Sequence, residues 1–250
     1  MASKGAWSTL LVISVMFWCN GAEAAELKGR VLLEGPPPAE EKLVIEPKKG
    51  IHSTEGCGSL VKRSQKLLVD ESGGVRNAVV WLEAPEASQK NPAESSPPLL
   101  LDQKQCVFEP HVVAVPVGRE VAIRNSDTAI HNIRIFREGN PSMLMHRWQK
   151  PDSADIRWRF SDPGPFVIRC GVHPWMYAWV FVAPGRWLTV TGESGRFLLD
   201  GVPEGRHTLH VWQETLGEKE VSVEVGKPGK IDAVPGREVS VSFQLKKQPE

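Results

Sequence analysis

A thiol, an imidazole and a thioether lie close together in the segment Cys-Gly-Val-His-Pro-Trp-Met at residues 170–176. A thiolate, two imidazoles and a weak axial thioether form the ligand set that suits a copper ion cycling between its two oxidation states. Cys170, His173 and Met176 supply three of these four donors. The spacing therefore predicts one mononuclear type 1 copper site per chain that needs one further imidazole.

The second imidazole has to come from another part of the chain, and we expect it to be His131. Residues 121–125 are typical of a strand, Asn125-Ser126-Asp127 forms a polar turn, and His131 follows. Taken alone, His131 is also compatible with a hydrogen-bonded turn residue. A Cys/His₂ set with a water could hold zinc instead, but the nearby methionine favours copper.

Several other residues carry metal-binding side chains. Thioethers select Cu(I), so Met143-Leu144-Met145-His146 is a candidate second copper site, the alternative being a loop that caps the fold. His111 follows Pro110 and is expected to be a structural hydrogen-bonding residue. His207 and His210 do not alternate along the chain with other potential metal donors, and we do not expect them to bind metal.

The overall composition excludes some partners and limits the number of cores. The chain has 250 residues with 30 Lys plus Arg and 30 Asp plus Glu, so net charge does not predict binding to nucleic acid or to an acidic membrane. With 41% apolar residues it can bury one large core or two smaller ones, and we expect two.

The first 24 residues have the pattern of a secretory signal: Lys4, an apolar run from Ala6 to Trp18, and then Ala22-Glu23-Ala24. We expect cleavage after Ala24, which removes Cys19 and delivers the protein to the periplasm or the exterior. No later stretch is apolar and long enough to cross a bilayer.

Export leaves three cysteines in an oxidising compartment, where free thiols pair. If Cys170 binds metal, Cys57 and Cys106 form an even pair, and we predict a disulfide between them. In the alternative, Cys170 pairs with one of the other two and leaves an odd thiol.

Short apolar runs bounded by Gly, Pro, Asn and Asp recur throughout the chain and indicate an all-β protein. The runs expected to be strands are residues 27–33, 75–83, 107–108, 112–117, 120–125, 132–136, 157–160, 166–170, 177–182, 188–191, 196–199, 207–212, 220–225 and 239–245. Residues 86–98 have the composition of a solvated loop. The spacing of the expected strands between residues 107 and 182 suits a Greek-key sandwich.

Residues 105–183 resemble the cupredoxin family, and the Cys170 loop is most similar to the short-loop members typified by amicyanin. The landmarks in family order are Phe108-Glu109-Pro110, the Gly118 turn, Asn125-Ser126-Asp127, His131-Asn132, the turn at residues 160–164 and the Cys170 loop. The resemblance implies that Asn132 donates its backbone amide toward the cysteine sulfur. Pro174 removes a backbone donor beside His173. The sequence departs from the family pattern in two places: Arg169 stands before the thiolate instead of an aromatic residue, and the connection at residues 140–155 is longer than usual.

The C-terminal part resembles the carboxypeptidase regulatory-like or transthyretin-like β-sandwich, through the turns at residues 191–197 and 202–205. The expected organisation is a signal at 1–24, a cupredoxin sandwich with an N-terminal β extension at 25–184, and a smaller immunoglobulin- or transthyretin-like sandwich at 185–250. The arrangement is similar to that of exported proteins described as methylamine-utilisation-like.

These patterns predict an exported carrier of single electrons that exchanges them with a cytochrome or a copper or quinone enzyme. A copper-sequestering protein and a metal-free recognition sandwich are the alternatives. We expect no enzymatic activity, because the chain lacks a His-x-His pair, a recognisable Ser/His/Asp arrangement and a phosphate-binding loop.

Overall fold

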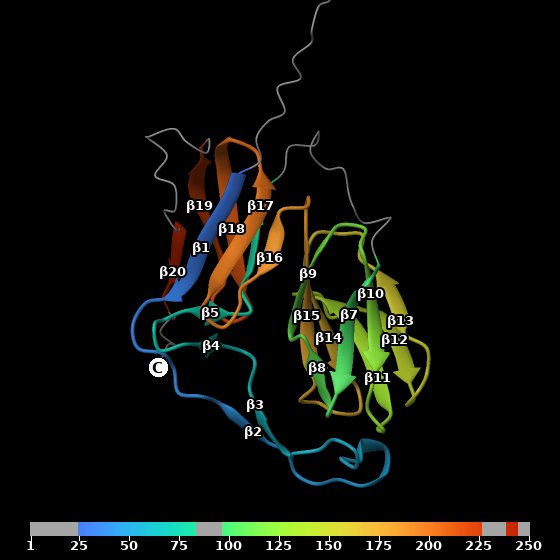
Figure 1. Cartoon of the computed structure of the whole chain (residues 1–250). Helices are drawn as coiled ribbons and strands as arrows, with labels where there is room; N and C mark the ends of the chain where they lie inside the picture. Colours follow the sequence, from blue (N-terminus) through green and yellow to red (C-terminus); the bar gives the residue numbers. More distant parts are fainter. Residues whose placement is uncertain (1–24, 84–96, 227–238, 245–250) are drawn as a thin grey trace, which may run out of the picture.

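The computed structural model describes residues 25–83, 97–226 and 239–244, and these residues form an all-β protein. The described part contains twenty strands and one 3₁₀ turn, η1 (Gly50–His52). They build two packed units, seen at the left and right of Figure 1. No helix in these ranges is both long and apolar enough to span a bilayer. The predicted signal and most of the expected loop at 86–98 lie outside the described residues.

The first unit is a sandwich of two sheets. One sheet has the order β12 (Met143–Gln149), β11 (His131–Arg137), β14 (Gly164–Cys170), β15 (Tyr177–Ala183) and β9 (Val112–Pro116). The other has the order β13 (Ile156–Arg159), β10 (Glu120–Asn125), β7 (Leu99–Lys104) and β8 (Val107–Glu109). Inward side chains such as Ile123, Ile135, Ile168 and Val180 are completely buried between them. Burying these faces is what holds the two sheets together.

Two strands of this sandwich were not among the expected runs. The segment at 140–155 contains β12 rather than only a connection, and β12 pairs with β11 in antiparallel register. Its exposed residues interrupt the alternation that marks a strand, because β12 lies at the edge of its sheet. Strand β7 is the apolar run after Pro98, which pairs in parallel with β10.

The second unit combines the C-terminal strands with strands from the N-terminal part of the chain. One of its sheets has the order β17 (Arg196–Val202), β1 (Ala25–Leu33) and β20 (Val239–Phe243). The other has the order β16 (Leu188–Val190), β6 (Val79–Leu82), β18 (Gly205–Gln213) and β19 (Gly217–Val225). We expected residues 25–184 to belong to the first unit, whereas strand pairing places β1 and β6 in the second. A module of about 60 residues buries too little surface alone, and these strands complete its core.

The two units meet along an apolar interface rich in aromatic residues. Trp81 and Trp212 of the second unit pack with Trp179 and Phe181 of the first. Glu214, just after β18, is buried there and pairs with two groups of the first unit. Its carboxylate lies 2.5 Å from His111 Nε2 and accepts a 2.8 Å hydrogen bond from Trp179 Nε1.

Between β1 and β6 the chain leaves the second unit and passes along one end of the first sandwich, through β2 (Lys42–Val44), η1 and β3 (Val61–Arg63) (Figure 1). It returns through the short pair β4 (Leu68–Val69) and β5 (Val75–Arg76). We call residues 45–60 the cover segment, because they lie over the candidate metal ligands.

Candidate metal centre

Strand pairing brings the predicted ligands together at one end of the first sandwich. His131 is the first residue of β11 and Cys170 is the last residue of β14, and the antiparallel pairing of these strands places the two ends side by side. His173 and Met176 lie in the connection from β14 to β15. Hydrogen bonds of 3.0 Å, from Met176 N to His173 O and from Cys170 N to Met176 O, close this loop.

The donor atoms of three predicted ligands converge on one point. His131 Nδ1 lies 3.1 Å from His173 Nδ1, and Cys170 Sγ lies 3.6 Å and 3.8 Å from these two nitrogens. Both imidazoles are completely buried and Cys170 is 4% exposed. The two rings come from different parts of the sandwich, so their positions are determined by the fold rather than by one loop.

The partners of the opposite ring nitrogens decide which atoms can bind a cation. His131 Nε2 lies 2.9 Å from Asp127 Oδ2, and His173 Nε2 lies 3.0 Å from Ser53 O. Because a carboxylate and a carbonyl can only accept, each Nε2 carries a proton; a neutral ring then has its lone pair on Nδ1, whereas a protonated ring can donate from Nδ1 to the Cys170 sulfur. When both rings are neutral, the two Nδ1 lone pairs at 3.1 Å beside the sulfur repel one another unless a cation lies between them. The residues present therefore fit a thiolate- and imidazole-bound metal ion.

The electrostatics of Cys170 favour the thiolate. Burial acts to raise the pKa of this thiol, but hydrogen bonds with His131 and His173 and with the backbone amides of Asn132 and His173 lower the pKa to about 5. For His131, burial lowers the pKa, whereas Asp127 and Cys170 outweigh it and raise the pKa above the ordinary value. The sulfur is thus ready to bind a metal at neutral pH without first losing a proton.

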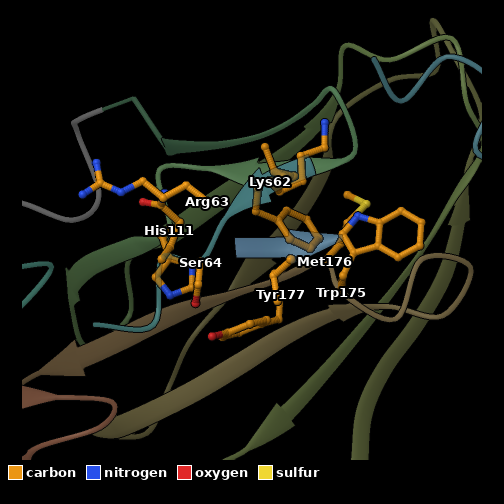
Figure 2. A pocket seen from close by; sticks show the side chains of 11 residues that line it. Lys62, Arg63, Ser64, His111, Trp175, Met176 and Tyr177 are labelled. Atoms are coloured by element: carbon orange, nitrogen blue, oxygen red, sulfur yellow. The ribbon is translucent and has the colours of Figure 1, made fainter. Parts of the chain in front are cut away.

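Met176 is 1% exposed and packs in the same core as Cys170. A small pocket touches its outer side, and Figure 2 shows Met176 beside Trp175 at one end of the pocket and His111 toward the other end. The pocket is not lined by Cys170, His131 or His173.

Asn132 connects the two ligand-bearing regions. Its backbone carbonyl accepts a 2.7 Å hydrogen bond from Gly171 N, and its backbone amide helps to lower the pKa of Cys170. The side-chain Nδ2 lies 2.7 Å from His146 Nε2. Pro174 is exposed in the ligand loop.

Asp127 is a further site residue, whose sequence context indicated only a polar turn. Besides orienting His131, its carboxylate accepts hydrogen bonds from the backbone amides of Gln105 and Cys106, the latter at 2.8 Å. The side chain is 4% exposed. The spacing of Asp127 and His131, four residues apart around a tight turn, is the signal that could have indicated this pair.

The predicted disulfide is confirmed: Cys57 and Cys106 are bonded, with Cα atoms 4.9 Å apart, while Cys170 is free. The bond attaches the cover segment to the sandwich beside the ligands, since Cys57 Sγ lies 3.8 Å from His173 Nε2. Pairing of Cys170 with either cysteine is thereby excluded. Trp175 Nε1 donates a 3.0 Å hydrogen bond to Cys106 O on the other side of the bridge.

The cover segment, which the sequence patterns did not reveal, closes the site from solvent. His52 Nδ1 lies 2.7 Å from Val172 O, next to the contact between Ser53 and His173. Gly56 has a φ of 84° and leaves no room for a side chain against Thr128. Lys62 is buried and donates 2.8 Å hydrogen bonds to the carbonyls of Cys57 and Gln105. Burial lowers the pKa of Lys62.

The other candidate donors do not join this centre. Met145 points into the sandwich core, while the adjacent His146 points to the opposite face of β12 and Met143 is exposed. These three side chains therefore do not converge on one ion. His111 contacts Glu214 and the ring of Tyr177 at the interface between the units.

No protein-family model matches the sequence, and no curated protein matches it either. Among solved structures, the chain is similar to a copper-containing nitrite reductase from Thermus scotoductus SA-01, at 22% identity and a TM-score of 0.33. That match covers 37% of this chain and 24% of the reductase. Amicyanin from Paracoccus versutus matches at 21% identity and a TM-score of 0.32, covering 36% of this chain and 88% of amicyanin.

A purple cupredoxin from Nitrosopumilus maritimus is also similar, at 21% identity and a TM-score of 0.31, with 34% of this chain and 99% of that protein covered. As their names state, the reductase contains copper and the Nitrosopumilus protein is a cupredoxin. Because the matches span about two fifths of the chain or less, the assignment of the metal rests on the donor set itself.

Proposed function

We propose that this chain is an exported, mononuclear type 1 copper protein that carries single electrons. The observation that supports the proposal is the convergence of Cys170 Sγ and the Nδ1 atoms of His131 and His173, each imidazole being held by a bond at its Nε2. Bound copper supplies a reversible one-electron couple. His131, Cys170 and His173 would hold the ion, and Met176 would supply a weaker fourth donor.

The protein's part in such a function is to keep the donors in place. Asp127 fixes one ring and Ser53 O fixes the other, while strands β11 and β14 fix the positions of His131 and Cys170. Burial excludes water from all three donors. Ligands that cannot rearrange give similar geometry in both oxidation states, which keeps the barrier to electron transfer low.

We propose a carrier rather than an enzyme, since the buried donors offer a substrate no access from the pocket in Figure 2. A disulfide beside the site suits the oxidising compartment to which the predicted signal would deliver the chain. The redox partner would be a cytochrome or a copper or quinone enzyme. Since the cover segment blocks His173, that partner would exchange electrons at the β12 face, where Asn132 links Cys170 to His146.

A second candidate function is copper sequestration without electron transfer. The observation that favours it is the complete burial of His173 under a disulfide-anchored segment. A covered ligand slows release of the ion and also lengthens the path to a partner. The two functions differ in whether the bound copper cycles reversibly.

The test is visible absorption of the mature full-length protein during titration with Cu(II), followed by reduction with ascorbate and reoxidation. We expect an intense blue or green band that saturates at one copper per chain, bleaches and returns. Cys170→Ser should lack the band, whereas His207→Gln, an imidazole outside the site, should retain it. Colourless uptake of Cu(I) alone would favour sequestration, and no uptake would reject both functions.

A further inference from the structure

The second unit contains a cluster of one buried histidine and three carboxylates on the face of the sheet that carries Trp81. His210 lies on β18 opposite Glu220 on β19, and Glu218 is two residues away on the same face. Glu83 approaches from the end of β6. The imidazole stacks on Trp81 with ring centroids 5.0 Å apart and an angle of 14° between the planes.

His210 is aimed into this cluster without a hydrogen bond of its own. Its side chain is 6% exposed, and neither ring nitrogen has a hydrogen-bond partner among the described residues. Nδ1 lies 3.4 Å from Glu220 Oε1 and 3.6 Å from Glu218 Oε1, and Nε2 lies 3.4 Å from Glu83 Oε1. Normal N–H···O hydrogen bonds are shorter, about 2.7–3.2 Å. A buried imidazole whose nitrogens have no hydrogen-bond partner lowers the stability of the fold unless a bound water or ion interacts with those nitrogens.

The distances instead match those between two ligands of one metal ion. Bonds of about 2.0–2.1 Å in a tetrahedral arrangement separate ligand atoms by roughly 3.3–3.4 Å. The ligand atoms of His210, Glu218 and Glu220 all lie within 4.8 Å of one another. The flexible glutamates, which are half-exposed or more, can close the remaining difference.

We propose that His210 Nδ1, Glu218 and Glu220 form a second metal site, which binds a divalent transition-metal ion of the zinc type with water in the remaining position. With the ion bound, the exposed Glu83 side chain would move the few tenths of an ångström needed to accept the Nε2 proton and fix the ring, the arrangement usual for metal-bound histidine. The ion neutralises the repulsion among the carboxylates and joins β18 to β19. The sequence patterns hid this site, because Glu83 lies far from His210 along the chain and His210, Glu218 and Glu220 share one face only when β18 pairs with β19.

The test is the number of zinc ions bound per full-length chain, measured by equilibrium dialysis and by calorimetric titration with Zn(II). We expect two ions in the wild type, one at Cys170 and one at His210. Cys170→Ser should keep the His210 ion, and His210→Gln should keep the Cys170 ion.

Because His210 packs on Trp81, Glu220→Gln provides an exposed substitution that leaves the core intact. It should weaken zinc binding at this site by at least roughly tenfold. Glu224→Gln on the same strand removes an equal charge outside the cluster and should change nothing. Equal zinc affinity and count in Glu220→Gln, His210→Gln and Glu224→Gln would overturn the proposal.

Discussion

Asp127 links the candidate metal centre to the disulfide-bearing loop, and Asp127→Asn tests that link. The carboxylate accepts hydrogen bonds from His131 Nε2 at 2.9 Å, Cys106 N at 2.8 Å and Gln105 N. The amide of asparagine keeps one oxygen but turns an N–H₂ group toward the remaining donors. One charge-assisted hydrogen bond is lost and one buried donor is left unsatisfied.

The expected cost follows from these contacts. A hydrogen bond to a charged group contributes about 1.5–3 kcal/mol, and a buried unsatisfied donor costs about 1–3 kcal/mol. Because these two costs describe in part the same lost contact, we expect the metal-free protein to lose about 2–4 kcal/mol of unfolding free energy. Loss of the bond that keeps the His131 proton on Nε2 should also lower copper affinity by about 10–100-fold.

The assay is urea unfolding of the full-length metal-free protein, followed by tryptophan fluorescence, together with Cu(II) titration against a competing chelator. Asp155→Asn is the matched control, because Asp155 pairs with the exposed Arg124 at the surface. An exposed pair contributes at most about 1 kcal/mol. If Asp127→Asn matched the control in both stability and copper affinity, Asp127 would not position His131.

Three further predictions concern the disulfide, the thiol and the interface. Replacing Cys57 and Cys106 by serine opens a loop of 49 residues, and the loop entropy gained by the unfolded chain should reduce the unfolding free energy by about 4 kcal/mol in denaturant titrations. The same substitutions should speed copper loss to a chelator. An unchanged release rate would show that the cover segment does not retain the ion. In the metal-free protein, ultraviolet thiolate absorbance should be present at neutral pH and disappear as pH falls through about 5, the lowered pKa of Cys170; a midpoint near the ordinary thiol value would contradict the hydrogen bonding described. Glu214→Gln leaves both His111 and Trp179 without a charged acceptor and turns an amide N–H₂ group toward one of them. It should cost about 2 kcal/mol in thermal or denaturant unfolding, whereas a loss below about 0.5 kcal/mol would show that this contact does not stabilise the interface.

The local patterns of the sequence predicted those parts of the protein that depend on neighbouring residues. The Cys170 loop carries three donor types within one turn of chain, so its chemistry is readable without a structure. Alternating apolar residues predicted most strands of the sandwich, because burial of one sheet face imposes a period of two. Cysteine counting predicted the bond between Cys57 and Cys106, which the structure contains.

The tertiary structure decided the features that depend on residues far apart in the chain. The cover segment reaches His173 across about 120 residues, and no local pattern marks Ser53 as its partner. Strands β1 and β6 join the second unit because their buried faces complete its core, although they precede the first unit in the sequence. The surroundings of His210 likewise exist only where β6, β18 and β19 lie side by side. The sequence by itself determined which donor atoms the protein carries, whereas long-range packing determined which of them meet and which are shielded from water.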